Sequence, residues 1–184
     1  AGEEWGPAAL VDEIQKHCPP DTIATVDSGA HRILLSQVWK CFQPRSLLQS
    51  SAFCTMGCAL PLAIGSKLSD PGRRVICFVG DASLEMVLGE LATLRDLGQN
   101  IFVVVFVDRS LALIEKKQRE SGFDALGVKF GGTDFVAVAQ AMGGVGVTVK
   151  DRTGIALALA EADGRQTFTL LACDIGTNAY DGRI

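Results

Sequence analysis

Asp81 and Asp108 are the residues whose type and spacing say most about chemistry in this chain. Each aspartate follows an apolar run typical of a buried strand, at 75–79 and at 101–107. A helix-like stretch, residues 84–97, separates the two runs, so the whole segment has the size of one β-α-β unit. Because both strands of such a unit end at the same sheet edge, we expect the two carboxylates to lie side by side.

Paired carboxylates of this kind suit a divalent cation. Mg²⁺ prefers oxygen ligands, and helices that begin just beyond the strands direct backbone N–H groups at the same place, which suits phosphate. A metal beside an anion site indicates a metal-bridged diphosphate. The alternative is that Asp81 and Asp108 only cap helices, a role in which aspartate is common. Their matched positions at two strand ends favour the metal site.

Several motifs together resemble the thiamine-diphosphate-binding domain of acetolactate synthase large subunits. Gly80-Asp81-Ala82-Ser83, with Asp108 27 residues after Asp81, is similar to the family's Gly-Asp-Gly motif, spacer and Asn-Asn. The resemblance extends from about residue 5 to about residue 180, nearly the whole chain. Three further segments carry it: Asp27-Ser28-Gly29-Ala30-His31, Thr55-Met56-Gly57 with the following 60–65, and 90–93 in the helix between the two strands.

The resemblance implies a role for individual residues. Asp81, Asp108 and the backbone carbonyl of Ser110 would bind Mg²⁺. The cofactor-binding residues would be Ala30 and His31 at the diphosphate, Gly80, Ala82 and Ser83 in the motif, Met56 between the two cofactor rings, and Cys54 through its carbonyl. Each also has a simpler interpretation: Ser83 as a turn residue, His31 as a cap or surface residue, and Met56 as core filler.

The resemblance also implies that this chain holds half of an active site. The cofactor supplies a carbon nucleophile and an electron sink for 2-oxo acid chemistry, and its activation needs a Glu on a separate pyrimidine-binding domain or subunit. Glu85 and Glu90 lie in the wrong helix for that role, so we expect no catalytic residue here. Two arrangements remain open: a C-terminal domain cut from a longer chain, which the start near Trp5 favours, or one subunit of a split 2-oxo acid decarboxylase.

Three departures from the family pattern bear on function. Ala82 replaces the second Gly of the motif and adds one methyl group. Asp108 replaces an Asn and adds a negative charge near the diphosphate, which costs about 1 kcal/mol in water-like surroundings and about 4 kcal/mol at an intermediate dielectric constant. Lys117 stands where these synthases often have a Trp that restricts the substrate pocket, so the acetolactate reaction itself stays open.

The elements that must position these residues alternate along the chain. Such alternation, with apolar strands, predicts an α/β fold: a doubly wound, mainly parallel sheet of about six strands with helices on both faces. The resemblance implies that this fold is one thiamine-diphosphate-binding domain over residues 1–184. Ligands bind such sheets at the carboxyl ends of the strands. The expected strands are 22–26, 46–49, 74–79, 101–107, 145–149 and 167–173, and the expected helices are 7–17, 31–40, 57–68, 84–97, 111–119, 134–142 and 155–162.

Composition limits the classes of partner. The 184 residues carry a net charge of −4 without a basic stripe, which argues against nucleic-acid binding. No apolar run reaches the roughly 18 residues that a membrane span needs. Six cysteines without a Cys-x-x-Cys pair indicate reduced thiols, with no zinc site or disulfide framework, and a cytoplasmic setting. We expect a homo-oligomer. Three functions remain open: the diphosphate-binding domain of a thiamine-dependent lyase or transferase acting on 2-oxo acids, a non-catalytic phosphate-binding module, and a degenerate cofactor-free domain.

Overall fold

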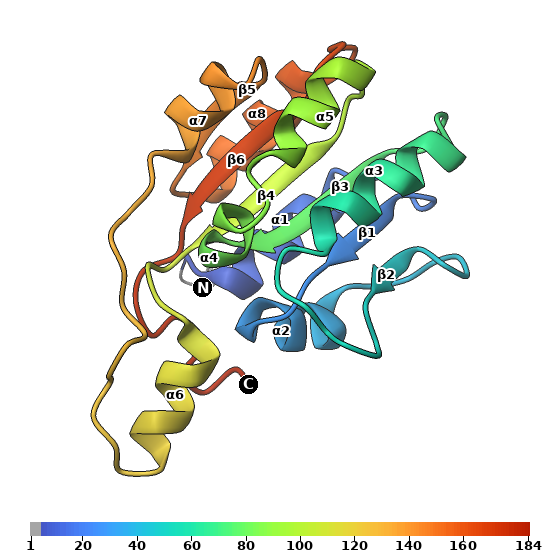
Figure 1. Cartoon of the computed structure of the whole chain (residues 1–184). Helices are drawn as coiled ribbons and strands as arrows, with labels where there is room; N and C mark the ends of the chain where they lie inside the picture. The colour runs from blue at the N-terminus through green and yellow to red at the C-terminus, as the bar shows by residue number, and fades with distance from the viewer. Residues whose placement is uncertain (1–4) are drawn as a thin grey trace.

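A computed structural model describes residues 5–184; residues 1–4, the start of the expected domain, lie outside the described residues. All six strands are parallel and form one sheet in the order β2-β1-β3-β4-β6-β5 (Figure 1). The predicted α/β class is therefore confirmed. The strands are β1 (Ile23–Val26), β2 (Leu47–Gln49), β3 (Val75–Gly80), β4 (Phe102–Val107), β5 (Val145–Val149) and β6 (Thr169–Asp174).

Helices cover both faces of this sheet, and each face has its own apolar core. One core packs α1 (Pro7–Lys16), α2 (Ala30–Val38) and α8 (Arg152–Ala162) against the sheet. The other packs α3 (Ala59–Ser69), α5 (Glu90–Leu97) and α7 (Phe135–Ala141) against the opposite face. Because β4 lies in the middle of the sheet, all six of its residues, FVVVFV, are buried. This two-sided burial explains why its sequence is continuously apolar.

One predicted helix is wrong in its limits. The expected single helix 84–97 is two helices, α4 (Asp81–Glu85) and α5, separated by a turn at residues 86–89. In this turn the hydrogen bonds link residues that are three positions apart, as in a 3₁₀-helix. Val87 N donates to Leu84 O, and Glu90 N donates to Val87 O. Gly89, a poor helix former, lies in the same turn. The consequence for the site is that Asp81 itself begins a helix.

The other boundaries shift by smaller amounts. Helix α8 begins three residues before the expected 155, because the Asp151 side chain caps it by accepting from Gly154 N at 2.8 Å.

Helix α6 (Ala112–Glu120) projects from the body of the domain, near the C-terminus (Figure 1). A salt bridge between Arg119 and Asp181 ties α6 to the last residues of the chain at 2.9 Å.

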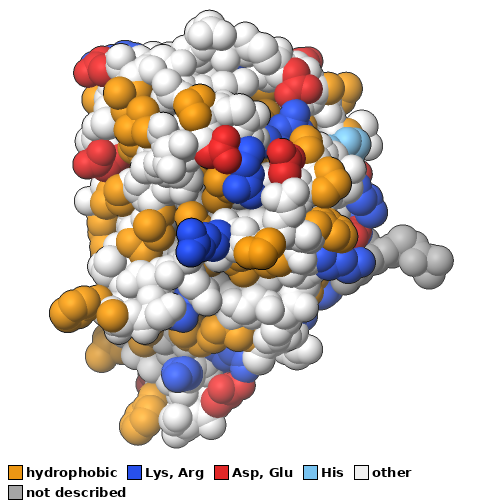
Figure 2. All heavy atoms as spheres, turned by 90° about the vertical axis from the view of Figure 1, so that its right-hand side faces the viewer, with side chains coloured by type: hydrophobic (Ala, Val, Ile, Leu, Met, Phe, Trp, Pro, Cys, Tyr) orange, Lys and Arg blue, Asp and Glu red, His pale blue; other side chains and the backbone are white. Residues whose placement is uncertain are grey.

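The surface shows mixed charge rather than one sign. On the face turned toward the viewer in Figure 2, acidic and basic side chains alternate with apolar ones. No helix formed by residues 5–184 has both the length and the apolar character required to cross a membrane.

Candidate diphosphate and metal site

The register of the sheet brings the two aspartates together. Strands β3 and β4 are neighbours, with Gly80 opposite Phe106, so Asp81 and Asp108 both follow the carboxyl ends of adjacent strands. The Asp81 carboxylate is held by three backbone N–H groups. Its Oδ1 accepts from Ala82 N at 2.8 Å, and its Oδ2 accepts from Asp108 N at 3.1 Å and Arg109 N at 2.7 Å. This carboxylate is thus fixed in orientation by the backbone on both strands.

Asp108 is the more perturbed member of the pair. Burial, followed by the negative charge of Asp81, raises the pKa of Asp108 to about 7, although Oδ1 accepts from Ser110 N at 3.0 Å. Burial also raises the pKa of Asp81, and the backbone hydrogen bonds oppose that shift. Two buried carboxylates that lie close together are difficult to ionise at the same time. A divalent cation bound between them would stabilise their ionised forms.

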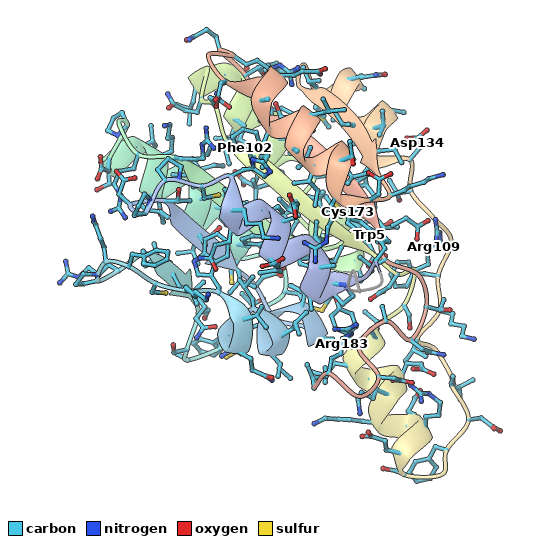
Figure 3. The ribbon with its side chains drawn as sticks, turned by 180° about the vertical axis from the view of Figure 1, so that it is seen from behind. Trp5, Phe102, Arg109, Asp134, Cys173 and Arg183 are labelled. Carbon is cyan, nitrogen blue, oxygen red and sulfur yellow. The ribbon has the colours of Figure 1, made fainter. Side chains whose placement is uncertain are left out.

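The neighbouring arginine does not neutralise this pair through an ion pair. Arg109 directs its guanidinium at Asp174, with Nη2 3.0 Å from Oδ2. Figure 3 shows Arg109 and Trp5 at the same end of the sheet, where Trp5 Nε1 donates to the carbonyl oxygen of Asp174 at 2.7 Å. Arg109 therefore secures the end of β6, while the carboxylates of the pair stay available to a cation.

Ser110 lines the pocket next to Asp108. Its backbone is held by an antiparallel bridge to Lys129, and its buried Oγ has no hydrogen-bond partner among the described residues. Within residues 5–184, no cluster of three or more His, Cys, Asp or Glu side chains could bind a metal ion. A cation here would need the two carboxylates, backbone oxygen and ligands from outside the chain, which is the chemistry of a Mg²⁺ that keeps phosphate and water oxygens.

A pocket of about 120 Å³ opens beside this pair, at the carboxyl ends of β1, β3 and β4. Two helices, α2 and α6, begin at its edge with Ala30 and Ala112. Their first N–H groups and their dipoles favour an anion there. Because complete pockets for organic ligands usually measure about 300–1,000 Å³, the chain holds room for part of such a ligand.

The structure brings nine of the ten predicted site residues to this pocket. Cys54 is the exception: its side chain does not line the pocket, and its Sγ accepts from Arg32 Nη1 at 3.2 Å. Its backbone φ of 49° lies in the left-handed region that glycine favours. The nine lining residues are Ala30, His31, Met56, Gly80, Asp81, Ala82, Ser83, Asp108 and Ser110.

Two of the simpler interpretations can be judged from burial. Met56 is half-buried at the pocket edge and belongs to neither apolar core, so it is not core filler. His31 is buried, with 5% of its surface exposed, so it is not a surface residue. Its ring stacks on Phe106 at 5.4 Å between centroids. Both side chains are therefore placed where a ligand in the pocket could contact them.

Sequence reasoning missed two groups of lining residues. The first turn of α6 contributes Leu111, Ala112, Leu113 and Ile114, which make the pocket wall apolar. The apolar run that directly follows Asp108-Arg109-Ser110 was the available signal. Phe106 lines the pocket from the second-to-last position of β4, a continuously apolar strand in which no sequence pattern separates it from its neighbours. Glu85 and Glu90, which we did not expect to be catalytic, have other positions. Glu85 accepts a hydrogen bond from Thr133 Oγ1, and Glu90 lies in the first turn of α5.

Comparisons with known proteins agree with this geometry. A family profile described as "Thiamine pyrophosphate enzyme, C-terminal TPP binding domain" matches residues 27–173. The chain is 32% identical to the acetolactate synthase large subunit of Parasynechococcus marenigrum (strain WH8102) over 166 residues, 88% of this chain and 27% of that protein. It is 29% identical to the acetolactate synthase isozyme 3 large subunit of Escherichia coli (strain K12) over 189 residues, 99% of this chain and 33% of that protein.

The matched region contains the whole pocket. It begins at Asp27, before α2, and ends at Cys173, beyond the last lining residue. The chain spans about a quarter to a third of the length of these relatives. With the paired aspartates, the pocket and the parallel sheet in place, the chain belongs to the family of C-terminal thiamine-diphosphate-binding domains of thiamine-diphosphate-dependent enzymes.

Proposed function

We propose that this chain binds Mg²⁺ and the diphosphate of thiamine diphosphate as half of the active site of an acetolactate-synthase-like enzyme. The observation that carries the proposal is the Asp81–Asp108 pair, buried at adjacent strand ends with the Asp81 carboxylate held by three backbone amides. A carboxylate aligned in this way has little to reorganise when a cation arrives. The Asp108 carboxylate uses only Oδ1 in a hydrogen bond within the described residues, which leaves Oδ2 for the metal.

Different residues at the pocket would bind the metal, the diphosphate and the rings of the cofactor. Asp81, Asp108 and the Ser110 carbonyl would hold Mg²⁺. Ala30 and His31 at the start of α2, and Gly80, Ala82 and Ser83 at the start of α4, would surround the diphosphate. Met56 would support the rings, and the Cys54 carbonyl would accept from the amino group of the pyrimidine. The bound cofactor supplies a carbon nucleophile and an electron sink for 2-oxo acids.

The reaction belongs to the lyase or transferase class: decarboxylation of a 2-oxo acid, carbon–carbon bond formation, or both. Lys117, at the position where the resembled synthases often have a Trp, lies in α6 but does not line the pocket, so the acetolactate reaction itself stays open. The missing part of the active site would come from a pyrimidine-binding domain or subunit in a homo-oligomer. The six free cysteines are consistent with a reducing, cytoplasmic setting.

Calorimetric titration tests the metal assignment. Inorganic diphosphate and thiamine diphosphate are titrated into the chain with Mg²⁺ and again with EDTA, and we expect binding only with Mg²⁺. Asp81→Ala should abolish this binding, whereas Asp96→Ala, at an exposed aspartate in α5, should leave it unchanged. Retained affinity in Asp81→Ala would refute the metal site.

The same titrations separate the competing functions. Binding of inorganic diphosphate that thiamine diphosphate does not match would favour a general phosphate-binding module. Absence of binding by either probe would favour a cofactor-free domain. Binding of thiamine diphosphate with Mg²⁺ supports the proposed half-site.

A further inference from the structure

Asp27 lies under the pocket and joins three of its segments. It follows the end of β1, and its side chain is fully buried. Its Oδ1 lies 2.6 Å from His31 Nε2 in the first turn of α2, and its Oδ2 accepts from Gly57 N at 2.7 Å. One carboxylate thus connects the diphosphate-side histidine with the loop that carries Met56.

These contacts determine which nitrogen of His31 carries a proton. The Gly57 amide can only donate, and an ionised carboxylate can only accept, so Asp27 requires His31 to be protonated on Nε2. In the neutral ring, Nδ1 is then the unprotonated nitrogen. No residue among 5–184 is hydrogen-bonded to Nδ1. The ring nitrogen opposite Asp27 is therefore free for a ligand.

Packing holds the ring so that Nδ1 stays at the pocket. The imidazole stacks on Phe106 with 23° between the ring planes. A Cβ at Gly29 would lie 2.5 Å from Cε1 and 2.7 Å from Nδ1, so only glycine allows the backbone to approach this edge of the ring. A Cβ at Gly80 would lie 3.1 Å from Cε1. Since Gly29 and Gly80 both line the pocket, the Cε1–Nδ1 edge lies beside it.

The loop on the other side of Asp27 is held just as closely. Gly57 has φ 80°, and a Cβ there would lie 2.8 Å from Val87 Cγ1 and 3.2 Å from the Ser83 carbonyl oxygen. Its amide is therefore fixed between Asp27 and the turn after α4. Met56 precedes it and lines the pocket, so the position of Met56 depends on the bond from Gly57 to Asp27.

We propose that Asp27 is a positioning residue for this pocket, a role that rests on the proposed function. Its carboxylate sets His31 to the Nε2-protonated tautomer, presents Nδ1 to the diphosphate side, and holds the Met56 loop. Asp27 itself does not reach the ligand, because it is buried beneath His31. Nδ1 is an acceptor for a metal-bound water or a protonated phosphate oxygen, and it becomes a donor when the ring is protonated.

Nuclear magnetic resonance of the two histidines tests the tautomer without any ligand. The chain has only His17 and His31, so a sample labelled with ¹⁵N-histidine shows two rings. We expect His31 to show a protonated Nε2 and an unprotonated Nδ1. His17 is the built-in reference, because its Nε2 lies 3.2 Å from Glu13 at the same four-residue spacing but its side chain is 40% exposed. A His31 protonated on Nδ1, or averaged between tautomers as in His17, would overturn the proposal.

The Asp27→Asn variant gives the second test. Gly57 N and His31 Nε2 contact different oxygens of Asp27, and Asn has an oxygen at only one of these two positions, so in the same orientation it cannot accept from both. Either the amide NH₂ faces Nε2 and His31 switches to the Nδ1-protonated tautomer, or it faces Gly57 and that amide exchanges with solvent at least about tenfold faster. Glu13→Gln is the matched control and should change neither His31 nor Gly57. An Asp27→Asn chain that keeps both the tautomer and the slow Gly57 exchange would refute the role, and if it does not fold, the wild-type spectrum still decides.

Titration of the same labelled sample distinguishes the two proposals. Thiamine diphosphate with Mg²⁺ should shift the His31 Nδ1 resonance and leave that of His17 in place. A correct tautomer in the free chain with no ligand-induced shift would refute the diphosphate function while leaving the Asp27 arrangement intact. A wrong tautomer together with Mg²⁺-dependent binding would refute only the role of Asp27.

Discussion

Asp108 is the residue of the site whose ionisation is most unfavourable. It is 6% exposed and lies beside the charge of Asp81, and these two causes raise its pKa from an ordinary 3.8 to about 7. A cation between the two carboxylates would remove that cost. The same residue therefore opposes folding of the metal-free chain and favours metal binding.

The Asp108→Asn variant should reveal this cost as a pH dependence of stability. Below about pH 3, under both pKa values, Asp108 is protonated in the folded and the unfolded states. As pH rises toward 7, the unfolded state ionises first, so the folded state binds more protons and the free energy of unfolding falls. Between pH 5 and 8, metal-free wild type should lose on the order of 2 kcal/mol relative to Asp108→Asn. Urea denaturation of both chains measures the difference, and parallel pH profiles would contradict it.

Cofactor affinity in the same variant tests whether the carboxylate is required. Asn keeps an oxygen ligand and removes one negative charge near the diphosphate, so the affinity for thiamine diphosphate with Mg²⁺ should rise or stay level. Asp96→Asn, which removes a charge at an exposed position in α5, controls for net charge. A tenfold or greater fall in Asp108→Asn would show that the metal needs both carboxylates.

At the scale of elements, close packing of helices on the sheet places the strand ends. Gly146 in β5 shows how little space this packing leaves. A Cβ there would lie 2.6 Å from Val136 Cα and 2.7 Å from the Val136 carbonyl oxygen, both backbone atoms of α7. Gly65, in the middle of α3, is exposed and has no atom within 4 Å of a Cβ placed on it.

These two glycines predict opposite effects of the same substitution. Gly146→Ala should destabilise the chain by about 1–3 kcal/mol, because α7 must move away from the sheet. Gly65→Ala should stabilise it by about 0.5–1 kcal/mol, because alanine favours the helix and restricts the unfolded chain. Urea denaturation of the two variants measures both changes. A neutral Gly146→Ala would mean that α7 is not packed as described.

Most elements were predictable from sequence because strands buried on both faces stand out as apolar runs. Strand β5 matches its predicted limits, 145–149, and the position of Asp81 beside Asp108 follows from the β3–α–β4 unit alone. The break between α4 and α5 was not predicted, although Gly89, a poor helix former, lies in the turn between the two helices. The hydrogen bond between Asp27 and His31 could not be predicted, although both residues belong to the segment Asp27-Ser28-Gly29-Ala30-His31, because spacing does not show which way a ring turns.

At the scale of the whole molecule, the segments around the pocket leave large apolar side chains uncovered. They come from the loop at 50–58, the turn after α4, helix α6 and the loop that follows it. Large apolar side chains that are left exposed tend to be buried by a partner. The exposed residues are Phe53 at 95%, Met86 at 63%, Ile114 at 50%, Phe123 at 70% and Leu126 at 80%.

We therefore expect the chain on its own to form dimers or larger assemblies through this surface. Replacing Phe53, Phe123 and Leu126 by Ser should shift the chain toward monomer in sedimentation velocity. Leu68 and Leu157 are similarly apolar and 51% and 58% exposed, but they lie on α3 and α8. Replacing those two by Ser is the control and should leave the association unchanged. Equal effects in both sets would show that association is non-specific.

The chain alone should bind its cofactor and yet be catalytically silent. Its pocket of about 120 Å³ accommodates part of a cofactor, and the alignments cover only 27% and 33% of the relatives named above. Glu85, which accepts a hydrogen bond from Thr133 Oγ1, and Glu90, in the first turn of α5, do not line the pocket. Incubation with pyruvate, thiamine diphosphate and Mg²⁺, followed by measurement of CO₂ release, tests this directly. The Asp81→Ala chain gives the background, and turnover in the wild type on the order of 1 s⁻¹ or more would show that the site is complete without a partner.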